Sequence, residues 1–335
     1  MIRPMRRPLA AALLAAGLFA APAHAADPED VVLAIPTLSP VFTTVFIADD
    51  LNLWGKEGLK VKHVHMLGVA NINAVLSGSA DFTMVTAGGM LRAVARGQKL
   101  LAIANVIDRP MMEIVLRKDL APGFDWNQPL EKRAQVLKGH TLGIGGINAI
   151  QHIYLRLVAK RAGIDAEKDI RVAPMESTNM LPAFKAKAID GFVGGLPFTL
   201  SAVLDGSATL IVSSLKGDLP ELVPFGYNVV VTTPKECQER RSVCEKVGRV
   251  IADAVDYLHD HQKESLAILK KRFAKMDNRL VEASFANILK ATPRPPVVTK
   301  ADFENAEKFN VEGGLVKPED KLKSYDHLYT NAFVH

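Results

Sequence analysis

Six short loops of this 335-residue chain contain the glycines and small polar residues that could hold a ligand. Each follows a segment predicted to be a strand, and together they cover residues 36–39, 68–69, 86–89, 145–149, 176–179 and 194–198. Their side-chain donors are uncharged, and none of the loops contains Lys or Arg: Thr37, Ser39, Thr86, Asn148, Ser177 and Asn179. Backbone amides at helix N-termini carry a partial positive charge. The loops could therefore bind a small oxyanion or a neutral polar molecule.

These loops must be positioned by the elements around them, and one pattern of elements occurs twice. A strand-like run, a helix-like run and a turn lead from residue 59 to Gly89, and the same succession leads from Ile170 to Gly195. Asp81 and Asp190 occupy matching places in the two turns, and we predict that each caps its own turn. Alternating strands and helices are typical of mainly parallel sheets covered by helices, where ligands bind beyond the carboxyl ends of the strands. The fold class predicted is α/β, with two similar lobes.

The predicted organisation has three parts. Residues 1–25 form a signal peptide, residues 26–107 together with 228–335 form lobe I, and residues 108–227 form lobe II. The chain would then cross between the lobes twice, and the two crossing strands would act as a hinge. From Lys235 onward the apolar spacing predicts a helical C-terminal segment.

The N-terminus has the features of an export signal. Arg3, Arg6 and Arg7 precede an apolar run at residues 9–21 and the small-x-small triplet at residues 23–25. We therefore expect a soluble periplasmic protein without a lipid anchor. Loss of the three arginines would lower the formal charge from +5 to +2, and the remaining Lys and Arg do not form the basic stripe that nucleic-acid binding requires.

The two cysteines, Cys237 and Cys244, are predicted to pair in an oxidising compartment. In one continuous helix their Cα atoms would be about 10.5 Å apart, whereas a disulfide needs roughly 4.4–6.8 Å. A disulfide would therefore require the helix to break between them, and Ser242 could cap the second helix. His63 and His65 lack a third ligand at a suitable spacing, so they are predicted to face solvent, and we predict no metal and no cofactor.

Three motifs carry a family resemblance. Residues 50–59, the turn at residues 76–82 and residues 137–144 resemble the periplasmic substrate-binding proteins of nitrate, sulfonate and taurine ABC transporters and their thiamine-precursor relatives. The resemblance implies a type II binding-protein fold, a monomer that holds one small molecule between its lobes and delivers it to an ABC permease and its ATPase. It implies a small polar or anionic ligand of the sulfonate, nitrate-like, carboxylate or pyrimidine-like classes.

The resemblance and the loop positions together give a set of predicted ligand-binding residues. The family's contacts fall on Pro36, Thr37, Gly68, Thr86, Gly88, Asn105, Asn148 and Gly195. The loop positions add Phe42, His152, Ser177, Asn179 and Phe198. His152 could face the cleft or the lobe core. Many family members have an aromatic residue followed shortly by Pro where this chain has residues 194–198, so the pocket could be wider or less polar.

Two other functions remain open at this point. An enzyme of the same fold that resembles pyrimidine synthases would need a lysine for a Schiff base with a pyridoxal-type cofactor, and no predicted cleft loop contains one. A sensor ectodomain that docks on a membrane kinase has the same sequence features as a transport protein. The glycines at residues 143–146 suggest a dinucleotide-binding turn, but Asn148 occupies the place of the third glycine.

Overall fold

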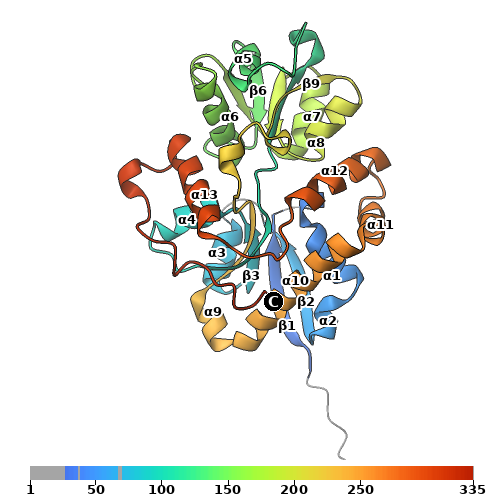
Figure 1. Cartoon of the computed structure of the whole chain (residues 1–335), viewed down its shortest axis with the longest axis vertical. Helices are drawn as coiled ribbons and strands as arrows, with labels where there is room; N and C mark the ends of the chain where they lie inside the picture. Colours follow the sequence, from blue (N-terminus) through green and yellow to red (C-terminus); the bar gives the residue numbers. More distant parts are fainter. Residues whose placement is uncertain (1–26, 37, 67–69, 335) are drawn as a thin grey trace, which may run out of the picture.

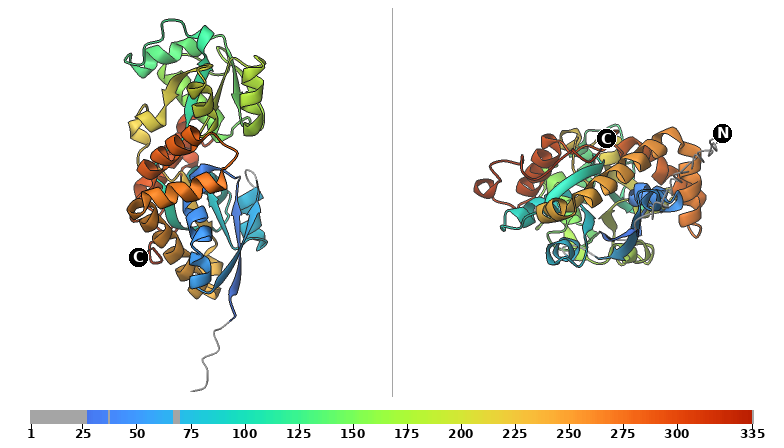
Figure 2. Two further views of the ribbon diagram at one scale, coloured as in Figure 1. Left: turned by 90° about the vertical axis from the view of Figure 1, so that its right-hand side faces the viewer. Right: turned by 90° about the horizontal axis from the view of Figure 1, so that it is seen from below.

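The computed structural model describes residues 27–36, 38–66 and 70–334. They form two α/β lobes stacked along the long axis, each built on a five-stranded sheet (Figures 1 and 2). The predicted fold class is therefore confirmed. The predicted signal peptide and the predicted ligand residues Thr37 and Gly68 lie outside the described residues.

The sheet of lobe I contains strands from both ends of the chain, in the order β2-β1-β3-β10-β4. β1 pairs in parallel with β2 and β3, whereas β10 is antiparallel to both β3 and β4. The strand bounds are β1 Glu29–Ile35, β2 Leu59–His65, β3 Phe82–Val85, β4 Leu101–Ile107 and β10 Asn228–Thr232.

The sheet of lobe II has the same arrangement, in the order β7-β6-β8-β5-β9. β6 pairs in parallel with β7 and β8, and β5 is antiparallel to β8 and β9. The strand bounds are β5 Glu113–Arg117, β6 Thr141–Ile144, β7 Arg171–Pro174, β8 Gly191–Gly194 and β9 Ala208–Ser213. β5 directly follows the first crossing between the lobes, and β10 directly follows the second. Figure 1 shows both crossings as connections between the two lobes. β4 ends at Ile107 and β10 begins at Asn228, although the lobe boundaries themselves stay a prediction.

Helices cover both sheets. In lobe I these are η1 Pro40–Phe42, α1 Thr43–Asp50, α2 Leu53–Lys56, α3 Ala70–Ser77 and α4 Ala87–Val94. Lobe II has α5 Leu130–Arg133, α6 Ile150–Arg161, α7 Ser177–Lys185 and α8 Phe198–Leu204, with 3₁₀ turns η2 Lys118–Leu120, η3 Ala134–Leu137, η4 Ser214–Lys216 and η5 Pro220–Leu222. The C-terminal segment adds α9 Pro234–Glu239, α10 Arg241–Asp260, α11 Gln262–Arg272, α12 Asn278–Ala291, α13 Lys300–Glu312 and η6 Pro318–Asp320. No helix in the described part of the chain is long and apolar enough to span a bilayer.

The helix α13 touches both lobes. It packs on α4 of lobe I, where Asn310 Nδ2 donates to the Gly88 carbonyl at 3.0 Å. Its far end reaches α6 of lobe II, where Arg156 Nη1 donates to the Gly313 carbonyl at 3.1 Å. A Cβ atom on Gly313 would lie 2.0 Å from Ile153 Cγ2, so only glycine allows this approach.

The repeated aspartates tie neighbouring strands together, and the prediction that each caps its own turn is wrong. Asp81 Oδ2 accepts from the Val32 amide at 2.6 Å, and Asp190 Oδ2 accepts from the Thr141 amide at 2.9 Å. Each carboxylate also pairs with an arginine, Asp81 with Arg240 and Asp190 with Arg117. Val32 precedes Asp81 by 49 residues, and Thr141 precedes Asp190 by the same number. The repeat therefore includes this hydrogen bond between an amide and a carboxylate.

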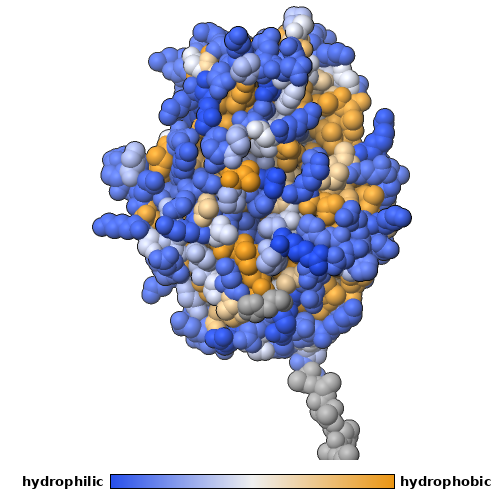
Figure 3. Space-filling model, in the orientation of Figure 1, coloured by the Kyte–Doolittle hydropathy of each residue, from blue (hydrophilic) through white to orange (hydrophobic). Residues whose placement is uncertain are grey.

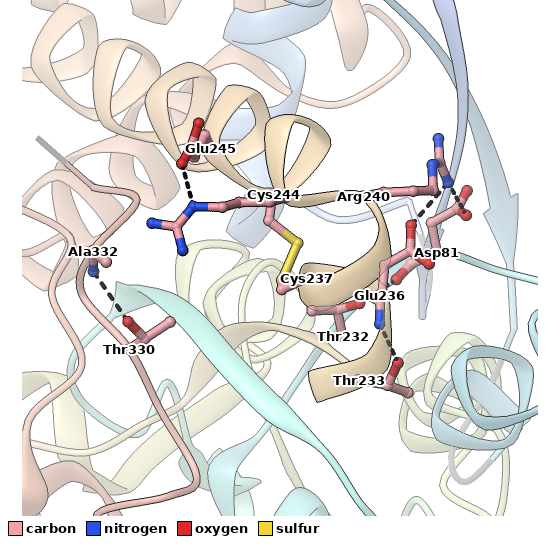
Figure 4. Close-up of a disulfide and its surroundings, with 11 residues drawn as sticks. Asp81, Thr232, Thr233, Glu236, Cys237, Arg240, Cys244, Glu245, Thr330 and Ala332 are labelled. Carbon is pink, nitrogen blue, oxygen red and sulfur yellow. Dashed lines mark hydrogen bonds and ion pairs between the residues drawn. A yellow bond between two sulfur atoms is a disulfide. The ribbon is translucent and has the colours of Figure 1, made fainter.

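Cys237 and Cys244 form a disulfide with a Cα–Cα distance of 5.6 Å, which confirms the predicted pair (Figure 4). The predicted helix break is also confirmed, because α9 ends at Glu239 and α10 begins at Arg241. Ser242 does not cap the second helix. Arg240 occupies that position with φ −124° and ψ 53°, and its guanidinium group bonds to Asp81 and to the Asp30 carbonyl.

Candidate functional site

A cavity of about 580 Å³ lies between the two lobes. Its walls come from the carboxyl ends of β1, β3 and β8, the starts of α6, α7 and α8, both crossing segments and the turn after α11; the lining residues are 36, 38–42, 84–86, 111–112, 150–151, 176–178, 180, 194–198, 227–228, 273 and 276. Three depressions of similar volume lie beside α9, beside α13, and between α6 with the residues after it and residues 312–314. Of the four, this cavity is the one at the strand ends of both sheets, where ligands of open α/β folds bind.

Six of the predicted ligand residues line this cavity: Pro36, Phe42, Thr86, Ser177, Gly195 and Phe198. Thr86 is the N-cap of α4, where its Oγ1 accepts from the Gly89 amide at 3.2 Å. Ser177 and Phe198 begin α7 and α8. Strand ends and helix starts were expected to meet at a ligand site, and these residues do lie together. Their contact with a ligand stays a prediction.

Five predicted ligand residues lie outside the lining: Gly88, Asn105, Asn148, His152 and Asn179. The Gly88 carbonyl bonds to α13, and the buried Asn105 side chain points to the Phe225 carbonyl at 3.5 Å. Asn148 is exposed and Asn179 lies on an exposed part of α7. In the sequence these five residues lie near residues that line the cavity. In the structure they make contacts within the protein or face solvent.

His152 faces the core of lobe II, which resolves the alternative left open by the sequence. Its side chain is fully buried, and its Nδ1 accepts from the Asn148 amide at 3.2 Å. Burial, followed by the nearby Arg156, lowers the pKa of His152 below its usual value. Asn148 followed by Gln151 three residues later resembles a capping box, but Ala149 is the N-cap of α6 and Gln151 lines the cavity.

Much of the lining is apolar, in line with the less polar pocket that residues 194–198 suggested, but the sequence did not predict which residues supply it. Five of the ten methionines of the chain line the cavity: Met84, Met111, Met112, Met180 and Met276. Orange, hydrophobic surface is visible in Figure 3 on the side of the molecule where α8 and α12 lie. The adjacent pair Met111 and Met112 lies in the first crossing segment, shortly after β4, and is a sequence signal for this wall.

The sequence of this chain also matches a known family. The sequence model described as NMT1/THI5 like matches residues 39–265. The chain belongs to this family. No functionally curated protein has a matching sequence.

Solved structures of similar fold extend the match beyond these residues. A Bordetella bronchiseptica RB50 protein is 17% identical with a TM-score of 0.73, covering 92% of this chain and 96% of its own. The alkanesulfonate-binding protein SsuA of Xanthomonas axonopodis pv. citri, bound to MOPS, is 18% identical with a TM-score of 0.66, covering 92% and 98%. The periplasmic nitrate-binding protein NrtA of Synechocystis PCC 6803 is 15% identical with a TM-score of 0.64, covering 87% and 83%. The NMT1/THI5-like chain therefore has the type II periplasmic binding protein fold.

The loop after β8 departs from the pattern expected for the family and is held close to the first crossing segment. A Cβ atom on Gly195 would lie 2.5 Å from the Met111 carbonyl oxygen. A backbone atom cannot move away as a flexible side chain can, so this NMT1/THI5-like chain needs glycine here. Gly195 thereby keeps the lobe II loop against the wall of the cavity.

The described residues contain no cluster of three His, Cys, Asp or Glu side chains that could hold a metal ion. His65 is exposed as predicted, but the prediction is wrong for His63. His63 is half-buried, and its Nε2 lies 2.8 Å from Asp49 Oδ1. In this NMT1/THI5-like chain that pair belongs to the outer surface of lobe I.

Proposed function

We propose that this protein is the periplasmic solute-binding component of an ABC import system. It would capture a small organic molecule between its lobes and present the closed form to a permease and its ATPase at the inner membrane. The carrying observation is a cavity of about 580 Å³ whose walls come from both lobes and from both crossing segments. Its volume lies within the range of about 300–1,000 Å³ that is typical of small-molecule sites.

Lobe closure follows from this geometry. A molecule that touches Phe42 and Thr86 of lobe I and Ser177 and Phe198 of lobe II makes more contacts when the lobes approach each other. It therefore binds the closed state more tightly and shifts the population toward it. A permease that recognises the closed form would then distinguish loaded from empty protein.

The similar structures and the N-terminal sequence support this proposal over an enzyme. The solved structures of SsuA and NrtA carry names of sulfonate- and nitrate-binding proteins, and residues 1–25 have the pattern of an export signal. A pyridoxal-dependent enzyme would need a lysine amine in the cleft, and among the described residues no lysine lines it. A sensing role would use the same closed form with a different membrane partner.

The test measures ligand-induced compaction. The mature protein is titrated with sulfonates, nitrate, carboxylates, pyrimidines and aromatic amides while the melting temperature and the radius of gyration from small-angle scattering are recorded. We expect at least one class to raise the melting temperature and reduce the radius of gyration. Binding without compaction would refute the transport mechanism, and cell fractionation of the full chain against a variant lacking residues 1–25 checks the predicted export.

A further inference from the structure

The charge of the cavity lining restricts the ligand further, on the basis of the proposed function. Among the described residues that line the cavity there is no Lys, Arg or His, and Glu176 is the one charged side chain. Residues 37 and 67–69, which lie outside the described residues, are the uncharged Thr, Leu, Gly and Val. The helix N-termini offer an anion only partial positive charges, so an anion that enters this space would lose its water without gaining a full opposite charge, and the exposed Glu176 side chain would repel it.

The apolar walls suit a flat hydrocarbon surface. Thioethers are polarizable and make favourable contacts with aromatic rings, and methionines line the cavity from lobe I, lobe II and the first crossing. Phe42 and Phe273 line the cavity from the lobe I side, and Phe198 lines it from α8 of lobe II. Aromatic rings on both sides can pack against a ring held between them.

A small number of neutral groups can orient such a ligand. Tyr227, in the second crossing segment, directs its hydroxyl at the sulfur of Met112 at 3.7 Å, which is a weak acceptor. Burial raises the pKa of Tyr227 to about 12, so its hydroxyl keeps its proton and can donate to a ligand oxygen or nitrogen. Gln151 and Ser177 add an amide and a hydroxyl from lobe II.

From these observations we infer that the cleft binds an uncharged organic molecule with a mainly apolar, ring-bearing body and discriminates against anions. The sulfonate, nitrate-like and carboxylate classes implied by the family resemblance then bind poorly, and so do small rings rich in polar atoms. Glu176 is the residue that contributes the repulsive part of this specificity, and the methionine and phenylalanine walls contribute the attractive part.

The experiment compares ligands that share one ring system and differ in charge. Isothermal titration calorimetry of the mature protein measures naphthalene-2-carboxamide, naphthalene-2-sulfonate and 2-naphthylmethylammonium, with cytosine and nitrate as small polar probes. We expect the carboxamide to bind at least about tenfold more tightly than the sulfonate, with a dissociation constant below about 1 mM. We expect the ammonium probe to bind more weakly than the carboxamide but more tightly than the sulfonate.

Variants then assign the discrimination to Glu176. Glu176→Gln should strengthen sulfonate binding about threefold, weaken ammonium binding by a similar factor and change carboxamide binding less than either. Glu131→Gln on the exposed start of α5 is the matched control and should change none of the three. Equal effects of the two variants would overturn the role of Glu176.

The possible failures of the two proposals can be told apart. A sulfonate, nitrate or cytosine that binds more tightly than the carboxamide and compacts the lobes overturns the inferred ligand class and leaves the solute-binding function standing. An ammonium probe that binds most tightly also overturns the uncharged class. If none of these probes nor the wider panel raises the melting temperature or compacts the protein, both proposals are refuted.

Discussion

The disulfide between Cys237 and Cys244 should stabilise the protein without affecting ligand binding. It joins α9 to α10 across a sequence separation of 7 residues. In the chain-entropy model a loop of this length lowers the entropy of the unfolded state enough to contribute about 2.4 kcal/mol at 25 °C. For a folding unit of roughly 150–250 residues, such as the predicted lobe I, the loss corresponds to a decrease of roughly 5–9 °C in the melting temperature.

The native structure near the disulfide should survive reduction. Arg240, at the break between the helices, is held by Asp81 at 2.7 Å and by the Asp30 carbonyl at 2.9 Å, and neither bond involves sulfur. The helices α9 and α10 contribute no side chain to the described lining of the cavity. Reduction should therefore change ligand affinity less than about twofold, a change that corresponds to roughly 0.4 kcal/mol.

The assay compares the thermal unfolding of oxidised and reduced wild-type protein, with two titratable thiols as proof of reduction. The double variant Cys237→Ala/Cys244→Ala should melt near the reduced protein and should not respond to reductant. Equal melting temperatures for oxidised and fully reduced wild-type protein would refute the argument, as would two free thiols in protein taken from the periplasm.

Three further predictions follow from contacts in the two lobes. Gly195→Ala should weaken ligand binding about tenfold or more in calorimetry, because its Cβ atom would lie 2.5 Å from a backbone oxygen. Asp190→Ala should lower the free energy of unfolding by about 2–3 kcal/mol in urea titrations, because it leaves the Thr141 amide without its acceptor and removes the partner of Arg117. Burial lowers the pKa of His152 in the folded protein, so as the pH falls the His152 side chain takes up a proton in the unfolded chain before it does so in the folded one. The free energy of unfolding of the wild type should therefore decrease as the pH falls through about 6.5. The His152→Gln variant should lose less.

Each of these predictions has a matched control. Gly194→Ala should be tolerated, because its Cβ atom would meet its nearest neighbour at an ordinary 3.4 Å. Asp119→Ala removes a more exposed partner of Arg117 and should cost less than about 0.5 kcal/mol. His327→Gln on the surface should follow the wild-type pH profile. Similar effects in a variant and its control would contradict the corresponding mechanism.

The sequence predicted the regular elements well where one local signal dominated. The short apolar run at residues 141–144 predicts a strand, and it is β6 with the same bounds. Ser39 followed by Pro40 predicts the start of one helix that runs to about residue 53, but the chain there is divided into η1, α1 and α2, and Asn52 has φ 52° at the second division. Asn tolerates the left-handed region, but its presence alone does not show that the chain adopts it.

The sequence predicted which strand ends and helix starts form the candidate site, but it did not predict the methionines that line it. Strand ends and helix starts indicated Thr86, Ser177 and Phe198, because the topology alone brings such positions together. The methionine wall depends on how the crossing segment turns between the lobes and on where the turn after α11 lies. Those are long-range features, and periodicity within one segment does not encode them.

The contact between Gly313 and α6 has a consequence for how the cleft opens. Rotation of two bodies leaves points near its axis in place, and the largest displacement occurs farthest from that axis. If the lobes hinge as proposed while Arg156 holds the Gly313 carbonyl, the axis would pass close to α13 as well as to the two crossing segments. The gap would then widen on the side of α8 and α12, and solute would enter and leave there.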